Sequence, residues 1–353
     1  MTLTQPPLIS TIMTVRNGEP YIEEAVNSIL SQTYSNFELI VVDNGSTDRS
    51  LELVRQYDDP RIRIIELGRN LGRTPALNIG WKEARGDYLA IQDADDRSLP
   101  DRFSQQVAFM EANPDVGVCG TWMQTFGEST QVLQYPTDHE TIKRSLLFGT
   151  GLGHSSILLR KRSFDARNLR YDESYQHCQD SALWSRAARW IQLANLPEVL
   201  AWYRIHPQQI SQAYSLQLRQ DESKRLWQQL SAELGVKASQ SQLDLHDQIY
   251  RLEFSASRAF VSQAEAWFYK LIRANRKAQY YAEPGFSKDL ADRWYAICDQ
   301  AKELGGWLAL KFWFSPLSKQ CSLTKLERKH FTNYCANKER ILLKPFRFLL
   351  TYL

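Results

Sequence analysis

Three carboxylates fall within four residues of this sequence. Asp93, Asp95 and Asp96 follow the apolar run at residues 88–91. Carboxylates this close together repel one another and raise each other's pKa unless a cation lies among them. A set of oxygen ligands on a tight loop suits Mg2+ or Mn2+, which also bind phosphate oxygens. The stretch therefore predicts a divalent-metal and phosphate site, although a solvated acidic turn would have the same short pattern.

The elements that must position these acids alternate between strands and helices. The apolar runs predicted as buried strands are residues 8–15, 37–42, 61–67 and 88–91. A helix is predicted after each strand, and Thr74 and Pro75 are predicted as the cap and first position of the third helix. This alternation is typical of a parallel sheet with right-handed crossovers. Such a sheet binds its ligand at the carboxyl ends of its strands, where the acids lie.

Two familiar phosphate-binding motifs are absent from the sequence. No G-x-G-x-x-G follows the first strand, and no G-x-x-x-x-G-K-[ST] occurs anywhere. Their absence argues against a dinucleotide site and against a P-loop. We therefore expect the acids at the strand ends to bind the ligand with the help of a metal.

The rest of the chain changes character near residue 214. Further strands are predicted at residues 116–123, 156–159 and 196–206, and further helices at 138–148 and 181–186. Long helical stretches rich in charges and aromatic residues follow at residues 216–234 and 243–274. We predict two domains, residues 1–213 and 214–353.

Composition limits the class of protein. Of the 353 residues, 43% are hydrophobic and 24% are charged, as in ordinary soluble proteins. The net charge of +3 is too small to indicate nucleic-acid binding. The five cysteines are scattered and odd in number, which favours a reducing compartment. We expect neither a signal peptide nor a membrane-spanning run, and therefore a cytoplasmic protein.

The order and spacing of several motifs resemble the family 2 glycosyltransferases, inverting nucleotide-sugar transferases of the GT-A fold. The resemblance covers roughly residues 8 to 213 and is carried by residues 12–17 (IMTVRN), 28–33 (SILSQT), 37–48 (FELIVVDNGSTD), 70–72 (NLG), 84–88 (ARGDY), 93–96 (DADD), 100–102 (PDR), 179–186 (QDSALWSR), 195–197 (NLP) and 203–206 (YRIH). It implies an α/β fold with a doubly wound, mostly parallel sheet. A mainly α-helical extension follows this sheet in the sequence.

The resemblance also implies how a nucleotide-sugar donor would be bound. Thr14 and Arg16 would lie along the base and ribose, and Asp43 would accept the imino hydrogen of uracil, which favours a UDP-sugar. Either Arg69 or Arg73 would contact the diphosphate, and spacing does not distinguish them. Asp93 would lie beside the donor.

The remaining implied roles concern the metal and the reaction. Asp95 would touch the ribose or the metal, Asp96 would bind Mn2+ or Mg2+, and His206 would complete the metal site. Asp180 matches the catalytic base that deprotonates the acceptor hydroxyl, as an inverting displacement requires. The metal and an arginine would neutralise the departing nucleoside diphosphate.

These roles predict a metal-dependent inverting glycosyltransferase that transfers a sugar to a glycan or lipid-linked acceptor in cell-surface polysaccharide synthesis. Gln179 stands where relatives commonly carry Glu, so a non-catalytic nucleotide-sugar-binding subunit remains an alternative. A sugar nucleotidyltransferase is a weaker one, because residues 16–18 (RNG) poorly match its glycine-rich basic loop. His154 fits equally well in a core or in an acceptor-site wall.

The C-terminal segment is basic and aromatic. Residues 302–353 contain ten basic and three acidic residues, and aromatic clusters occur at 305–314 and 341–353. Such segments can lie in a membrane interface beside anionic lipid. An ordinary helical subdomain or a homodimer contact has the same composition. We therefore expect a cytoplasmic protein that either is free or is peripheral at the inner membrane face, without a nucleic-acid partner.

Overall fold

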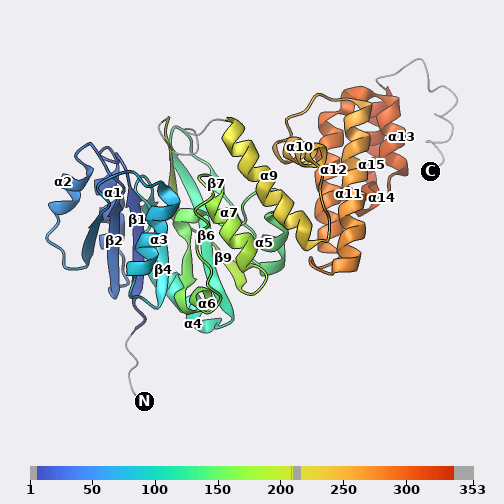
Figure 1. Cartoon of the computed structure of the whole chain (residues 1–353). Coiled ribbons are helices and arrows are strands. Elements are labelled where there is room, and N and C mark those ends of the chain that lie inside the picture. Colours follow the sequence, from blue (N-terminus) through green and yellow to red (C-terminus); the bar gives the residue numbers. More distant parts are fainter. Residues whose placement is uncertain (1–5, 208, 210–215, 338–353) are drawn as a thin grey trace. The chain divides into compact units, whose positions relative to one another are not determined.

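The computed structural model describes residues 6–207, 209 and 216–337. The chain divides into two compact units, residues 1–222 and 223–353 (Figure 1). The domain boundary expected at residues 213 and 214 lies outside the described residues and stays a prediction, as does any role for residues 341–353.

The first unit is built on a mixed sheet. Its strands are β1 (Ile9–Val15), β2 (Phe37–Asp43), β3 (Ile62–Glu66), β4 (Tyr88–Asp93), β5 (Arg97–Ser98), β6 (Val116–Gly127), β7 (Val132–Leu133), β8 (Leu158–Arg160) and β9 (Gln192–Ile205). Their order across the sheet is β3-β2-β1-β4-β8-β6-β9-β5, with β7 paired to β6. Strands β1 to β4 are parallel, as predicted, whereas β8 is antiparallel to both β4 and β6.

Helices cover both faces of this sheet. They are α1 (Ile22–Leu30), α2 (Ser50–Arg55), α3 (Arg73–Glu83), α4 (Arg102–Ala112), α5 (His139–Ser145), α6 (Lys161–Asp165) and α7 (Gln179–Ala187), with a 3-10 turn, η1, at His154–Ser156. Alternate residues of a strand point to opposite faces. Accordingly, Ile9 and Met13 of β1 pack with α1, α2 and α4, whereas Ile12 packs with α3 and α7.

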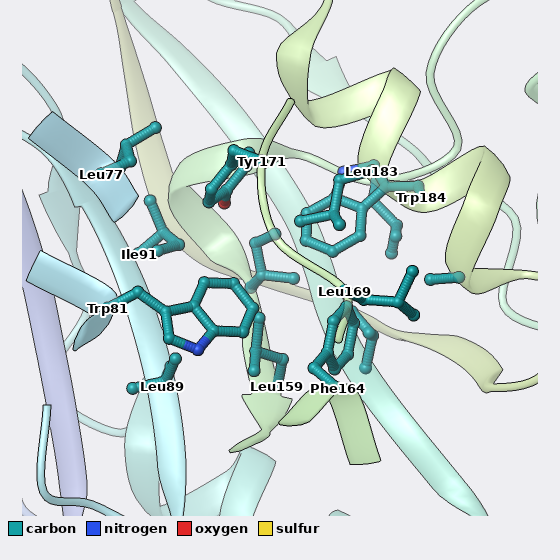
Figure 2. Packing of buried hydrophobic residues seen from close by; sticks show 14 of the residues in the cluster. Leu77, Trp81, Leu89, Ile91, Leu159, Phe164, Leu169, Tyr171, Leu183 and Trp184 are labelled. Atoms are coloured by element: carbon teal, nitrogen blue, oxygen red, sulfur yellow. The ribbon is translucent and has the colours of Figure 1, made fainter. Parts of the chain in front are cut away.

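An aromatic cluster fixes α3 and α7 on one face of the sheet (Figure 2). Trp81 of α3 lies 5.6 Å from Phe164 and 5.9 Å from Tyr171, measured between ring centroids. Trp184 of α7 meets the same two rings edge-on. All four side chains are almost completely buried. Because both helices are anchored here, the residues at their amino-terminal ends are held in place.

Two local features differ from the prediction. The expected Thr74 cap is wrong, because α3 begins at Arg73 after Gly72, and the Thr74 hydroxyl instead donates to the carbonyl of Tyr175 at 2.7 Å. A buried hydroxyl needs such a partner. The two-residue strand β5 was not predicted, since it is too short to show a pattern. It pairs with β9, with Arg97 opposite Trp202.

The C-terminal part of the described chain is helical. Its elements are α9 (Leu216–Glu233), α10 (Gln240–Arg251), α11 (Arg258–Ala278), α12 (Gly285–Gln300), η2 (Lys302–Leu304), α13 (Gly306–Phe314), α14 (Pro316–Gln320) and α15 (Lys325–Asn337). The single stretch predicted at residues 243–274 is broken, because Leu252 adopts a left-handed conformation and Ser257 caps the next helix. Within the described residues, every helix is too short or too polar to cross a bilayer.

Candidate active site

The carboxyl ends of the parallel strands form one edge of the sheet. Thr14 lies opposite Asp93 in the β1–β4 pair, and Val15 lies opposite Asp43 in the β1–β2 pair. A cleft opens at this edge, lined by Thr14, Val15, Arg16, Asn17, Gly18, Pro20, Tyr21, Arg73, Asp93, Ala94, Asp95, Tyr203, His206 and Gln209. This is where an open α/β sheet places its ligand.

One wall of the cleft is fixed by hydrogen bonds between two loops. The Asn17 carbonyl oxygen Oδ1 accepts from the Thr47 backbone N–H at 2.8 Å. The Gly18 N–H donates to the Ser50 hydroxyl at 2.7 Å, and the Glu19 N–H donates to Asp48 at 3.0 Å. Asn17 has a positive φ of 55°, a conformation that Asn tolerates better than most residues. The loop after β1 is therefore held in shape by the loop after β2.

The three predicted acids lie together beyond the end of β4. One carboxylate oxygen from each of Asp93, Asp95 and Asp96 lies within 4.8 Å of the others. Asp96 is only 1% exposed, and it accepts from the Ser155 hydroxyl at 2.5 Å and from the Arg204 backbone N–H at 2.9 Å. Burial and the charges of Asp95 and Asp93 raise the pKa of Asp96 well above its ordinary value. A cation in the cluster would remove this penalty.

Arg73, at the start of α3, partly balances these charges. Its Nη2 atom lies 2.5 Å from Asp93 and 3.0 Å from Nδ1 of His154. Burial alone would raise the pKa of Asp93, but the Arg73 charge, with smaller contributions from the nearby polar side chains of His154 and Ser155, outweighs burial, so this pKa is lowered. Asp93 is therefore ionised and paired, whereas Asp96 has no cationic side chain as a hydrogen-bond partner among the described residues.

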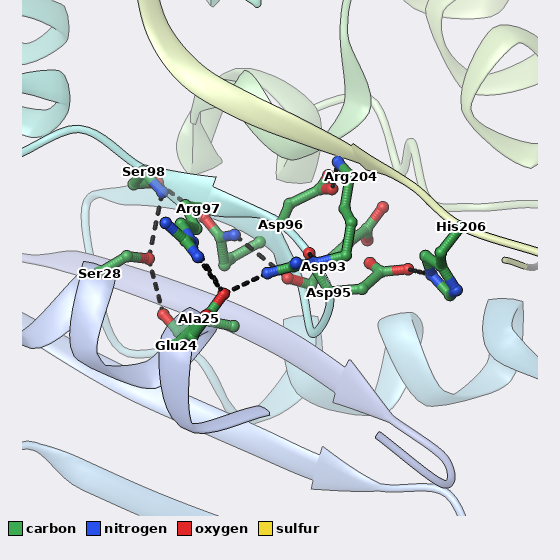
Figure 3. A network of polar contacts seen from close by, with 11 residues as sticks. Glu24, Ala25, Ser28, Asp93, Asp95, Asp96, Arg97, Ser98, Arg204 and His206 are labelled. Carbon is green, nitrogen blue, oxygen red and sulfur yellow. Dashed lines mark hydrogen bonds and ion pairs between the residues drawn. The ribbon is translucent and has the colours of Figure 1, made fainter. Parts of the chain in front are cut away.

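His206 and Arg204 reach the acid loop from the end of β9 (Figure 3). His206 Nε2 lies 3.0 Å from Asp95, and its ring lies 4.7 Å from that of Tyr21. Its other ring nitrogen, Nδ1, is buried and has no hydrogen-bond partner among the described residues. The Arg204 guanidinium donates to the Asp95 backbone carbonyl at 2.9 Å and also pairs with Glu24. Imidazole nitrogen beside carboxylate oxygen is a common ligand combination for divalent ions such as Mn2+.

A second hollow adjoins the cleft and contains Asp180. It is lined by Arg73, Asp93, Met123, Leu133, Tyr135, Thr150, Leu152, Gly153, His154, Ser155, Gln176, His177, Cys178, Gln179, Asp180 and Tyr203. Arg73, Asp93 and Tyr203 line both spaces. Asp180 lies in the first turn of α7, and its charge contributes to a raised pKa of Arg73. The carboxylate of Asp180 in the hollow therefore acts electrostatically on Arg73, which lines both the hollow and the cleft.

The structure places the predicted site residues in four positions. The residues that line the cleft are Thr14, Arg16, Arg73, Asp93, Asp95 and His206. Asp96 lies behind it, and Asp180 lies in the adjoining hollow. Asp43 and Arg69 line neither space: Asp43 is 4% exposed and accepts from the Ser46 N–H at 3.2 Å, and Arg69 is exposed to solvent.

Sequence reasoning missed two partners of the acid loop. Ser155 carries no recognisable signal, since a lone serine after a glycine-rich segment predicts nothing. Arg204 lies inside the motif at residues 203–206, and its place directly before the predicted end of a strand was a usable hint. Its backbone N–H, which bonds to Asp96, could not have been predicted from residue type.

A mixed α/β sheet with an acid-lined cleft at its carboxyl edge is the arrangement in which such folds bind a ligand. Residues 10–169 match the model of glycosyl transferase family 2. An uncharacterised glycosyltransferase of Haemophilus influenzae is 32% identical over 222 residues, which cover 59% of this chain and 69% of the relative. The chain therefore belongs to glycosyl transferase family 2 and is a glycosyltransferase.

Two further comparisons agree with this assignment. The O-antigen biosynthesis glycosyltransferase WbnJ of Escherichia coli is 32% identical over 221 residues, covering 58% of this chain and 83% of the relative. The crystal structure of S. aureus TarS 1-349 in complex with UDP-GlcNAc superposes with a TM-score of 0.57 at 18% identity, covering 84% of this chain and 90% of that one. At this identity, the similarity to TarS establishes the fold.

Proposed function

We propose that this chain is a metal-dependent inverting glycosyltransferase that moves a sugar from a UDP-sugar to a hydroxyl of a glycan or lipid-linked acceptor in cell-surface polysaccharide synthesis. The observation that carries the proposal is the acid cluster, whose third member, Asp96, is buried and has no cationic side chain bonded to it within the described part of the chain. The name of the relative WbnJ supports the polysaccharide context, and the UDP-GlcNAc complex of TarS supports a UDP-sugar donor.

The cleft would hold the donor nucleotide. Thr14 and Arg16, beside the fixed loop after β1, would lie along the base and ribose. Arg73 is the better candidate for the diphosphate, because it lines the cleft, whereas Arg69 does not. For Asp43 to bind uracil, the base would have to reach its carboxylate past Ser46, whose backbone N–H donates to that carboxylate.

The residues beside the acid loop fit a divalent cation, Mn2+ or Mg2+. Asp95 and His206 line the cleft, Asp96 lies behind them, and the buried Nδ1 of His206 has no hydrogen-bond partner among the described residues. When bound, such a cation neutralises the charge that develops on the departing nucleoside diphosphate. Arg73 would add a second positive charge at the same place.

Asp180 would act as the general base. Inversion requires that the acceptor hydroxyl lose its proton on the face of the sugar opposite the leaving group. Asp180 lies in the hollow next to the cleft and is separate from the acid cluster, as that geometry needs. The aromatic rings of Tyr135 and Tyr203 in the same hollow are suitable for stacking on an acceptor sugar.

The second unit would carry a peripheral membrane contact or a homodimer contact. A shallow groove between α11 and α13 is lined by Glu265, Tyr269, Trp307, Leu310, Lys311, Phe314, Ser315 and Pro316. Phe314 is 72% exposed, and the Arg258 guanidinium lies 5.6 Å from the Trp307 ring centroid. Exposed aromatic side chains beside basic ones are typical of surfaces that meet anionic lipid.

The donor site is tested by calorimetric titration of UDP into the full chain, first with Mn2+ and then with EDTA. We expect Mn2+-dependent binding to the wild type and loss of that dependence in Asp96→Asn, which keeps the size of the side chain. Asp115→Asn is the matched control, because Asp115 is exposed and lies outside both spaces.

Binding of UDP with equal affinity in Mn2+ and EDTA would contradict the metal site. Binding of GDP or dTDP in place of UDP would contradict the donor assignment. A chain that binds UDP but transfers no sugar to any acceptor would instead favour the non-catalytic subunit.

A further inference from the structure

His154 lines the hollow and contacts a polar group through each of its two ring nitrogens. Its Nδ1 atom lies 3.0 Å from Nη2 of Arg73, and its Nε2 atom lies 3.0 Å from the Tyr171 hydroxyl. The His154 side chain is only 9% exposed. It is neither an acid-loop residue nor a member of any motif that carries the family resemblance.

The hydrogen-bond partners define which nitrogen of His154 carries the proton. A guanidinium can only donate, so Nδ1 must accept from Arg73 through its lone pair. Nε2 then carries the hydrogen and donates to the Tyr171 oxygen. Tyr171 is 3% exposed and packs against Trp81 and Trp184 in the aromatic cluster. The imidazole is therefore held from behind by the core of the first unit.

Arg73 is held through one of its terminal nitrogens. A guanidinium has five N–H hydrogens, two of them on Nη2. Both contacts of Arg73 run through Nη2, one to Asp93 at 2.5 Å and one to His154 at 3.0 Å. The hydrogens on Nη1 and Nε have no hydrogen-bond partner among the described residues, and neither atom is fully buried. Those three donors stay available to a ligand in the cleft that Arg73 lines.

We propose that His154 is a positioning residue, which holds Nη2 of Arg73 together with Asp93 so that Nη1 and Nε are presented to the diphosphate of the donor. This inference rests on the diphosphate role proposed above for Arg73. Without His154, Nη2 keeps only the Asp93 carboxylate, and the guanidinium can rotate about that single contact. A carboxylate alone neutralises the arginine without orienting it, whereas two acceptors on one nitrogen fix the plane of the group.

The inference is tested by comparing UDP with uridine as ligands of His154→Ala in the full chain. Because the phosphates are the groups that Arg73 would contact, we expect UDP affinity to fall about five- to tenfold, the value of one hydrogen bond. Uridine affinity should not change. His154→Asn should restore UDP affinity, since its Oδ1 can replace Nδ1 as the acceptor. His139→Ala is the matched control, because His139 lies outside both spaces.

A double-mutant cycle with Arg73→Ala separates positioning from a merely structural role. In the Arg73→Ala background, His154→Ala should cause no further loss of UDP affinity. Equal losses of UDP and uridine affinity, or additive losses in the cycle, would overturn the inference. If His154→Ala does not fold, Tyr171→Phe replaces it, because this change frees the imidazole while keeping the buried ring.

The outcome also distinguishes this inference from the proposed function. Tight UDP binding by the wild type and by His154→Ala alike would overturn only the role of His154. If the wild type binds GDP instead, the same cycle is measured with GDP and guanosine. A chain that binds no nucleoside diphosphate would overturn both.

Discussion

Residues around the acid loop differ in how their charges are balanced. Asp93 has Arg73 as a partner. The buried Arg102, on which the charge of Asp96 acts, bonds instead to Gln92, Ser98, Gln106 and two backbone carbonyls. Burial lowers the pKa of Arg102 to about 9, although Asp96 opposes this shift. Arg102 therefore supports the loop from behind, and the proposed cation would meet the cluster from the cleft.

Asp180 is expected to serve the chemical step and not donor binding. Asp180→Asn keeps the size of the side chain but removes the proton acceptor, so we predict a fall in kcat of about 10²- to 10⁴-fold. UDP affinity should stay within twofold of the wild type, about the experimental error. Steady-state kinetics with a UDP-sugar, together with calorimetry, measure both quantities. Unchanged transfer by Asp180→Asn would assign the base to another residue.

The surroundings of Glu38 indicate that part of the protein's stability is lost at acid pH. Its carboxylate accepts from the Ser10 hydroxyl at 2.6 Å, the Arg85 N–H at 3.0 Å and Arg63 at 2.9 Å. Burial alone would raise the pKa of Glu38, but these partners lower it below the ordinary value of 4.5. The stability that ionised Glu38 contributes is therefore fully present above that pH and is lost as the pH falls through the lowered pKa.

Glu38→Gln should lower the free energy of unfolding by about 1 kcal/mol at neutral pH. The difference from the wild type should shrink as the pH is lowered from about 5 to about 3. Urea unfolding across this pH range measures the difference in free energy. Glu52→Gln is the control, because Glu52 is exposed. A difference that stays constant with pH would contradict the ionised role.

Among the elements, α3 connects the core to the cleft, and Gly80 sets how closely it approaches the sheet. A Cβ atom at Gly80 would lie 2.6 Å from Cγ2 of Ile12 and 3.2 Å from Cγ2 of Val42. Both neighbours are buried and well packed. A side chain here must therefore displace either Ile12 and Val42 or the helix itself, which carries Arg73 at its first position.

Gly80→Ala should lower the free energy of unfolding by about 1–3 kcal/mol, the usual cost of overpacking a core. It should also weaken UDP binding, because Arg73 would be displaced. Lys82→Ala, on the exposed side of the same helix, should change neither quantity. Denaturant unfolding and calorimetry measure the two effects, and a Gly80→Ala protein as stable as the wild type would refute the close packing.

At the scale of the whole molecule, donor binding is proposed for the first unit, and a membrane contact is proposed for the second. We predict that the full chain binds vesicles containing anionic lipid, and that Phe314→Ser reduces the bound fraction about fivefold by removing an exposed aromatic side chain. Vesicle flotation measures the bound fraction. Trp190→Ser is the control, because Trp190 is 63% exposed but lies in the first unit. Equal binding by Phe314→Ser and the wild type would favour the alternative of a packed helical unit or a dimer.

The sequence by itself determined the parallel half of the sheet and the acids at its edge. Both depend on local patterns: apolar runs of strand length, helices between them, and polar residues directly after each strand. Such patterns predict that Thr14, Asp93 and Asp95 share one edge, because parallel strands all end on the same side. The start of α7, whose first turn contains Asp180, was predicted from the same kind of local pattern.

Only the tertiary structure decided how distant residues reach these acids. The Nε2 of His206 contacts Asp95 across 111 positions of sequence, because the two-residue strand β5 pairs with β9 and brings the end of β9 to the acid loop. That Arg73 lines the cleft and Arg69 does not, and the contacts of His154 and Ser155, likewise depend on where α3 and η1 pack. Contacts of this kind are fixed by strand order and packing, which residue type and spacing along the chain do not record.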